Sequence, residues 1–332
     1  MKVFFSKGII VLAVAACVGS FSGYALTGKP MPKFFGGNNN QHENNNDNKD
    51  DKDKNKKDKI DLKIDSQCHY YNYDPSNENS IKEGELAGYF DVGCFFDGQP
   101  FGTWEATDLG RQKFFNFADV KPGDRGEDTI SLHTTGGDGC GEIIFKNIKD
   151  IGNDCTEPET QTKDPDCKKK EPGKIEKHGE LREAMEFSLW LDQGRTPGFQ
   201  GQNDPGEGDN IYNEKDLLIM DWKNIHKYPS VEQIRKHIRL ARKAAFAQCQ
   251  AADPDGDGKN TQSGVCAGLP RDGRMLSGTV YYYGFGWRLP AEIGNEVQTD
   301  SLVFDMAFSV KSNQACTPCA NQCYECDSKC SD

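Results

Sequence analysis

The sequence predicts an all-β protein, a jelly-roll-like β-sandwich with one helical insertion. Three observations support this fold class: apolar and polar residues alternate along several segments, turn-forming residues separate those segments, and only one stretch has helical periodicity. Alternation with a period of two turns one row of side chains toward a core and the other toward solvent. Many strands of this kind, joined by turns that contain Pro and Gly, are typical of a β-sandwich.

The alternation is clearest at 301–310, where the residues that face one way are Leu302, Phe304, Met306, Phe308 and Val310. Further alternating segments lie at 86–96, 129–133, 142–148, 184–191 and 279–287. A type II turn is predicted at 121–124, because Pro122 and Gly123 occupy its two central positions. These segments define the strands of the predicted sandwich.

A helix is predicted at about 230–250 as an insertion into the β-rich chain. Ser230 and Gln233 have the spacing of a capping box. The apolar residues that recur at helical spacing are Ile234, Ile238, Ala241 and Ala245. We therefore expect one face of this helix to pack on the sandwich and its basic face to be solvated.

Residues 1–25 have the layout of a secretion signal. Lysines near the start precede a short apolar run, Ile9–Ala16, which is too short to span a bilayer. Two processing sites fit the sequence: cleavage after Ala25, or cleavage before Cys17, which would then carry a lipid anchor. Both predict an extracellular or cell-surface protein with no transmembrane helix in its mature chain.

The rest of the chain divides into a tether, a folded domain and a tail. Residues 26–59 are predicted to be a disordered polar linker, since 36–59 contains no apolar residue. The sandwich domain is expected at 60–312, followed by a Cys-rich tail at 313–332. The net charge of −12 argues against a nucleic-acid partner, which would need clustered Lys and Arg.

Thirteen cysteines indicate a disulfide framework, because twelve remain once Cys17 is assigned to the signal. The disulfide candidates are Cys68, Cys94, Cys140, Cys155, Cys167, Cys249, Cys266, Cys316, Cys319, Cys323, Cys326 and Cys330. The last five form two C-x-x-C pairs and one further cysteine, a pattern that disulfides, a zinc ion or redox exchange could each explain. The spacing leaves the connectivity open.

The segment after the predicted helix, at about 253–261, resembles the first half of an EF-hand calcium loop. Its D-x-D-x-D-G pattern places three carboxylates around a sharp turn at Gly258. The predicted calcium ligands are Asp253, Asp255 and Asp257, with the main-chain carbonyl of Lys259 and with Thr261.

The loop departs from the EF-hand pattern at its twelfth position. Gly264 stands there instead of a bidentate Glu, so a further ligand must come from elsewhere, and Asp272 is a candidate. A looser acidic segment, 203–210, has a composition that could bind a cation but is more typical of a plain loop.

No catalytic motif is present, and the sequence does not predict an enzyme. It contains no H-E-x-x-H zinc motif, no G-x-S-x-G nucleophile elbow and no Walker loop.

Two segment pairs resemble the TasA- and camelysin-like family of exported proteins. The first comprises 115–124 and 127–133, and the second comprises 289–301 and 304–308. The resemblance implies a jelly-roll domain, a signal peptide cut after Ala25 by a SipW-type peptidase, and assembly into extracellular fibres. Camelysin is described as a metallopeptidase, but no matching zinc ligands occur here.

Fibre-forming relatives of this family imply strand addition, in which the N-terminal segment of one subunit completes the sheet of the next. The candidate donor segments here are Leu26–Phe35 and Ile60–Ile64. The main hypothesis is therefore an exported structural protein of a fibre, matrix or surface layer that self-assembles into a homopolymer.

The alternative hypothesis is a surface-tethered module that binds a ligand or carbohydrate. It rests on a cluster of aromatic side chains that could stack on sugars, namely Tyr281, Tyr282, Tyr283 and Trp287.

Overall fold

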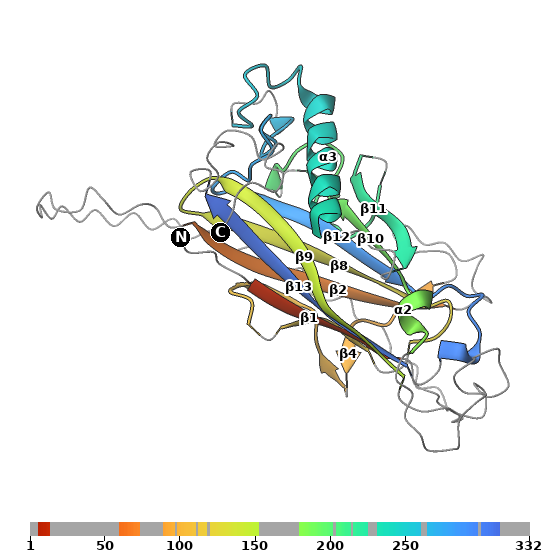
Figure 1. Ribbon diagram of the computed structural model, residues 1–332. Coiled ribbons are helices and arrows are strands. Elements are labelled where there is room, and N and C mark those ends of the chain that lie inside the picture. Colours follow the sequence, from red (N-terminus) through yellow and green to blue (C-terminus); the bar gives the residue numbers. More distant parts are fainter. Residues whose placement is uncertain are drawn as a thin grey trace, which may run out of the picture.

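The strands form two sheets that pack face to face. The structure is a computed structural model, and it describes residues 6–13 (backbone only), 60–73, 89–96, 98–110, 112–117, 120–152, 179–201, 204–213, 215–224, 231–259, 264–297 and 300–312. The strand layers and the long helix beside them are seen in Figure 1. The all-β sandwich predicted from the sequence is thus confirmed.

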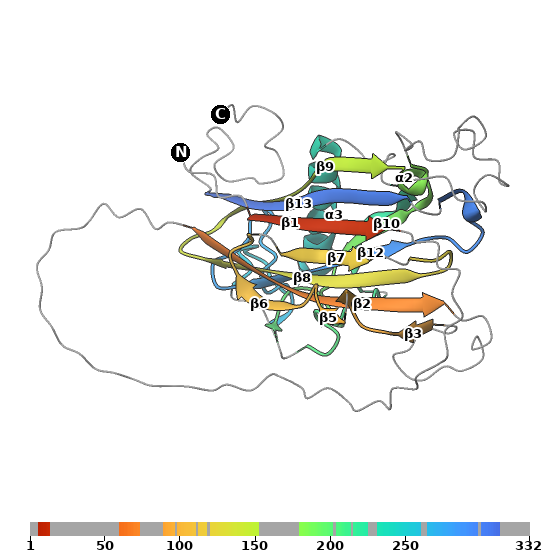
Figure 2. The ribbon, with the colours of Figure 1, turned by 90° about the horizontal axis from the view of Figure 1, so that it is seen from below.

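The smaller sheet has four strands in the order β7 (Lys113–Phe117), β1 (Ser6–Ala13), β13 (Ser301–Ser312) and β9 (Gly139–Ile151). In Figure 2, β1 lies between β13 and β7. All neighbouring pairs in this sheet are antiparallel except β1 and β7, which are parallel.

The larger sheet is antiparallel throughout. Its strands follow the order β11 (Leu217–Asn224), β10 (Glu186–Leu191), β12 (Val280–Arg288), β8 (Arg125–Thr135), β2 (Asp61–Tyr73) and β3 (Tyr89–Asp91), with β6 (Trp104–Thr107) also paired to β2. A separate pair consists of β4 (Phe95–Phe96) and β5 (Gln99–Pro100).

The chain crosses repeatedly between the two sheets, as in a jelly-roll-like sandwich. The chain passes from β7 in the smaller sheet to β8, back to β9, and across again to β10. It crosses once more between β12 and β13. At these crossings, strands that are adjacent in sequence lie in opposite sheets, whereas β10 and β11 are antiparallel neighbours in the larger sheet.

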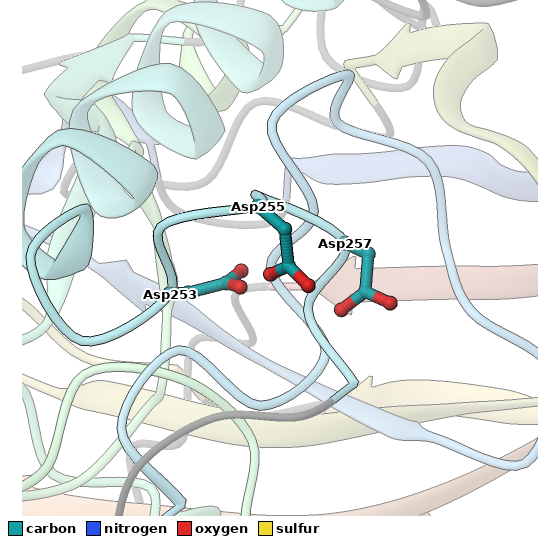
Figure 3. A group of neighbouring side chains, drawn as sticks. All are labelled: Asp253, Asp255 and Asp257. Atoms are coloured by element: carbon teal, nitrogen blue, oxygen red, sulfur yellow. The ribbon is translucent and has the colours of Figure 1, made fainter.

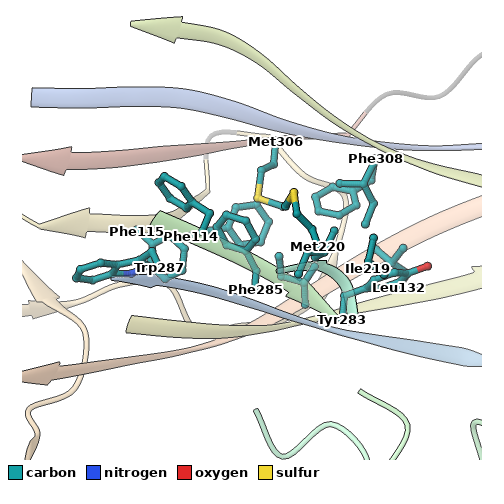
Figure 4. Packing of buried hydrophobic residues seen from close by; sticks show 14 of the residues in the cluster. Phe114, Phe115, Leu132, Ile219, Met220, Tyr283, Phe285, Trp287, Met306 and Phe308 are labelled. Atoms are coloured by element: carbon teal, nitrogen blue, oxygen red, sulfur yellow. The ribbon is translucent and has the colours of Figure 1, made fainter. Parts of the chain in front are cut away.

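The core is a layer of aromatic rings between the sheets (Figure 4). Phe115 of β7 lies 5.9 Å from Phe285 of β12, measured between ring centroids, and Phe304 of β13 lies 5.4 Å from Phe187 of β10. These four rings are fully buried. Because each ring pair joins one sheet to the other, the aromatic layer fixes how the sheets pack.

The predicted helix is α3 (Val231–Cys249), and it lies against the two strands at one side of the sandwich. It contacts β11 of the larger sheet and β9 of the smaller sheet. Ile238, Ala241 and Ala245 are buried, as the helical spacing predicted, and Phe246 is buried beside them. The burial of Ile234, the fourth predicted position, lies outside the described side chains. The proposed cap residue Ser230 lies outside the described residues.

Two predicted strands differ from the observed elements. The segment 86–96 is split into β3 and β4 by Gly93, whose φ of +68° breaks the extended chain. The segment 184–191 becomes a strand only at Glu186, because the residues before it form the short helix α2 (Leu181–Ala184). The Asp300 carboxylate accepts hydrogen bonds from the Glu180 and Leu181 amides at the start of α2, which sequence periodicity could not reveal.

The close packing of Trp190 against the backbone of β12 yields a stability prediction. A Cβ atom added at Gly284 would lie 1.9 Å from the Trp190 ring, so Gly284→Ala must displace a buried indole. We expect a loss of about 2 kcal/mol or more in the free energy of unfolding, measured by denaturant titration. The matched control is Gly110→Ala, because Gly110 is exposed and its added Cβ would meet only the Gln112 side chain, at 3.6 Å. Equal stabilities for the two variants would contradict this packing.

Candidate functional site: an internal strand position and two acidic loops

The strand β1 occupies an internal position in the smaller sheet. All eight of its residues pair with β13, from Ser6 opposite Phe308 to Ala13 opposite Ser301. On its other side, Ile9–Leu12 pairs with β7. The backbone of β1 is therefore hydrogen-bonded along both edges, as an inner strand requires.

The same residues belong to the predicted secretion signal. Cleavage after Ala25 and cleavage before Cys17 would both remove Ser6–Ala13. The strands β13 and β7 would then face each other across an empty position, each with one edge unpaired. Their inward side chains include Phe115 and Phe304, which are fully buried in the intact sandwich.

The structure excludes one of the two candidate donor segments. Ile60–Ile64 runs into β2, which pairs with β8 from Asp61 to Tyr71, and the Ile64 side chain is fully buried. This segment is already part of the protein's own larger sheet, so the prediction that it could be donated to a neighbour is wrong. The other candidate, Leu26–Phe35, lies outside the described residues.

The structure brings together the three carboxylates of the predicted calcium loop. Asp253, Asp255 and Asp257 each offer an oxygen, and these oxygens lie within 4.8 Å of one another (Figure 3). Asp253 is fully buried, and its two carboxylate oxygens accept hydrogen bonds from the Gly256 and Gly258 amides, at 3.2 and 2.9 Å. Both glycines have positive φ, which explains why the turn needs them.

The three carboxylates repel one another. The pKa of Asp255 is raised, mainly by its hydrogen bond with the Asp253 carboxyl and also by burial and the Asp257 charge. A divalent cation bound to the three oxygens would replace this repulsion with attraction, and carboxylate oxygens are ligands that calcium accepts. The three carboxylates are therefore placed so that they could hold a metal ion, and calcium as that ion stays a prediction.

The other predicted ligands are only partly placed. The Lys259 ammonium lies 3.7 Å from Asp138, so its side chain is engaged elsewhere and its main-chain carbonyl is the group that remains for a cation. Thr261 lies outside the described residues. Asp272 forms an ion pair with Arg274 at 3.1 Å and is not a member of the three-carboxylate group.

A second group of acidic residues gathers in the connection between β10 and β11. Asp192, Asp204 and Asp216 are buried and Glu207 is half-buried, whereas Asp209 is exposed. Main-chain amides donate to these carboxylates: Asn210 to Asp192 at 3.1 Å, Gln193 to Asp216 at 3.0 Å, and Gln200 to Glu207 at 2.8 Å. The carboxylates thus organise the loop backbone, a role that the composition of 203–210 did not reveal.

This acidic group holds its protons unusually tightly. Burial raises the pKa of Asp192 to about 8, and the charges of Asp216 and Asp209 add to the rise. Burial likewise raises the pKa of Asp216 to about 7 and that of Glu207 to about 7. At neutral pH these three carboxyl groups are therefore only partly ionised, because burial favours their neutral forms.

The described cysteines support a disulfide framework. Cys68 of β2 is bonded to Cys94, which tethers the segment after β3 to the larger sheet, and Cys140 and Cys266 are also disulfide-bonded. Cys249 is the last residue of α3. The remaining disulfide candidates lie outside the described residues, and these are Cys155, Cys167, Cys316, Cys319, Cys323, Cys326 and Cys330. Cys17, the possible lipidation site, also lies outside them.

The aromatic cluster considered for sugar binding is part of the core. Tyr281, Tyr283 and Trp287 are at most 1% exposed, so their faces cannot stack on a ligand at the surface. Tyr282 is half-buried, and its ring packs against the backbone at Gly208. This arrangement removes the observation that favoured a carbohydrate-binding module.

Comparisons with known proteins leave the family open. No protein-family model matches the chain, and no curated protein matches it either. The resemblance to TasA- and camelysin-like proteins therefore stays a prediction that rests on the quoted segments. None of the helices in the described ranges has the length and apolar character needed to span a bilayer.

One substitution in the Asp253 loop is predicted to lower the number of calcium ions that the protein binds. Asp255→Asn keeps the size of an exposed side chain but removes one of the three charges, so we expect the variant to bind one fewer calcium ion. Isothermal titration calorimetry with calcium alone would measure the stoichiometry. Asp221→Asn, which changes another exposed acid, is the control. Identical calcium binding by Asp255→Asn and the wild type would show that the loop is only an acidic turn.

The second acidic group predicts a pH dependence of stability. The native pKa values of Asp192 and Asp216 lie well above their unfolded values near 4, so the native state binds more protons between about pH 4 and pH 8. Their contribution to the free energy of unfolding should therefore fall as the pH rises through this window. In chelator, the variant Asp192→Asn/Asp216→Asn should lose less stability between pH 5 and pH 8 than the wild type. Denaturant titrations at several pH values test this, and parallel pH profiles would contradict it.

Proposed function

We propose that this protein is an exported structural subunit of an extracellular fibre, matrix or surface layer, and that its subunits polymerise by strand addition. The observation that supports the proposal most strongly is that β1, an inner strand, consists of residues predicted to be removed on export. A processed subunit would have a vacant strand position flanked on both sides.

An unfilled position of this kind strongly favours association. The exposed edges of β13 and β7 would present rows of unpaired N–H and C=O groups, which are a template for another strand. The position is flanked by apolar strands, so a strand that enters it gains both main-chain hydrogen bonds and burial of its inward side chains. In an assembly, the nearest source of such a strand is a neighbouring copy of the same chain.

The proposed donor is Leu26–Phe35, which begins the chain after cleavage at Ala25. It contains apolar residues at both ends, and its two prolines, Pro30 and Pro32, are two residues apart. Alternate residues of a strand direct their N–H groups to the same side. Because proline has no backbone N–H, Pro30 and Pro32 would weaken hydrogen bonding along one edge of the strand only.

The tether at 36–59 gives this donor the reach that polymerisation needs. A flexible polar chain of this length has an end-to-end distance of roughly 27 Å. That span exceeds the spacing of several strands in a sheet, so the donor can extend to a neighbouring subunit. The disulfides in the described domain would help such an assembly survive outside the cell.

Electron microscopy of three versions of the chain tests the proposal. Residues 26–332 should form regular filaments or sheets in negative stain, with and without calcium. Residues 36–332, which lack the donor, should not assemble. The chain 1–332 with its processing sites blocked should remain monomeric, because its own β1 fills the position.

The three versions separate strand addition from other association. Particles of 26–332 that are strictly monomeric would overturn the proposal. Equal assembly of 26–332 and 36–332 would show that subunits associate without the donor segment. Circular dichroism of each version would confirm that the sandwich is folded before assembly is scored.

A further inference from the structure

Two buried polar side chains in the connection between β10 and β11 have atoms that are not hydrogen-bonded. Asp192 has no exposed surface, and its Oδ2 atom accepts a hydrogen bond from the Asn210 amide at 3.1 Å, whereas its Oδ1 atom has no partner. Asn210 is 2% exposed, and neither atom of its side-chain amide is hydrogen-bonded. Leaving such groups unsatisfied is costly, so a ligand that supplied the lacking partners would stabilise the fold here.

The surroundings of these two side chains are negatively charged. The carboxylates of Asp216 and Asp209 lie close enough to Asp192 for their charges to act on it. Main-chain amides hold both in place: Gln193 and Asn213 donate to Asp216, and Ile211 donates to Asp209.

The described residues provide no compensating positive charge at this position. No Lys or Arg of the described ranges forms an ion pair with Asp192, Asp209 or Asp216. Arg195 acts only at longer range, where its charge lowers the pKa of Asp209. An ionised carboxylate buried without a cationic partner is costly, and a bound divalent cation would offset that cost.

We infer that Asp192 and Asn210, with Asp216 and Asp209 beside them, form a second cation site that takes a divalent cation of the calcium class. The Oδ1 atoms of Asp192 and Asn210 are the ligands that the fold leaves open. Carboxylate and amide oxygens are hard donors suited to calcium, and the absence of His and Cys from this set disfavours zinc.

This site differs in construction from the Asp253 loop. Its three carboxylates do not all gather within 4.8 Å of one another, as those of the Asp253 loop do. A cation here would take an oxygen from the Asn210 amide and would keep bound water, which is common for calcium. The cation would neutralise charge that the fold has already buried.

The site also has a structural consequence. The Asp192 amide donates to the Tyr282 carbonyl at 3.0 Å, so Asp192 is fixed to β12. Asn210 has a φ of +64°, a backbone conformation that is uncommon for a residue other than glycine. A cation held by both residues would clamp this loop to the larger sheet.

The inference is tested by measuring calcium binding to the variant Asp255→Asn, which serves as the background for further substitutions. In Asp255→Asn, the Asp253 loop has lost a ligand, so any tight calcium binding that remains must occur elsewhere. We expect this variant to retain one bound calcium ion in isothermal titration calorimetry, with calcium as the only added metal.

Adding Asn210→Gly to that background should then weaken the remaining binding about tenfold or more. Glycine adopts positive φ without steric cost, so this change removes the side-chain amide and leaves the backbone conformation accessible. A second double variant, with Asp192→Asn, should show the same loss. Addition of Asp221→Asn is the matched control and should leave the remaining binding unchanged.

Two outcomes would overturn the inference. One is that Asp255→Asn binds no calcium at all. The other is that Asn210→Gly and Asp192→Asn bind calcium as tightly as the background variant. Thermal unfolding in chelator verifies that each variant is folded, so that lost binding is not mistaken for lost structure.

Discussion

An inner strand of a sheet must be hydrogen-bonded along both edges, and this requirement governs the smaller sheet of the sandwich. Its four strands are continuous only because β1 lies between β13 and β7. Without β1 the sheet would be split, and the aromatic layer beneath it would lose part of its cover. The proposed assembly follows from this requirement, because a strand from another subunit restores the same pairing without any change in the fold.

Buried negative charge is the second constraint on the structure. The two acidic loops are joined through main-chain hydrogen bonds: Phe199 donates to Ala267 at 2.7 Å, and Cys266 donates to Pro197 at 2.8 Å. The Gln200 side chain also donates to the Gly264 carbonyl at 2.9 Å. Cations bound at the two loops would therefore stabilise one connected region of the protein, and their effects on stability should reinforce each other.

Sequence patterns predicted the elements that are strongly periodic. The strand at 301–310 and the helix α3 were found because a core imposes a period of two on a strand and of 3.6 on a helix. The Asp253 loop was found for a similar reason, since its ligands lie close together in sequence. The site around Asp192 was missed, because Asp192 and Asp216 are separated by a long loop and come together only on folding.

The sequence by itself determined the class of fold, the place of the helix and the local acidic turn, because each depends on residues within a few positions of one another. Only the tertiary structure decided which strands are neighbours, that Ile60–Ile64 is committed to the larger sheet, and that Tyr281 and Trp287 are core residues. Strand pairing and burial depend on contacts between distant parts of the chain. A local sequence pattern does not identify the distant segment with which a strand pairs or packs.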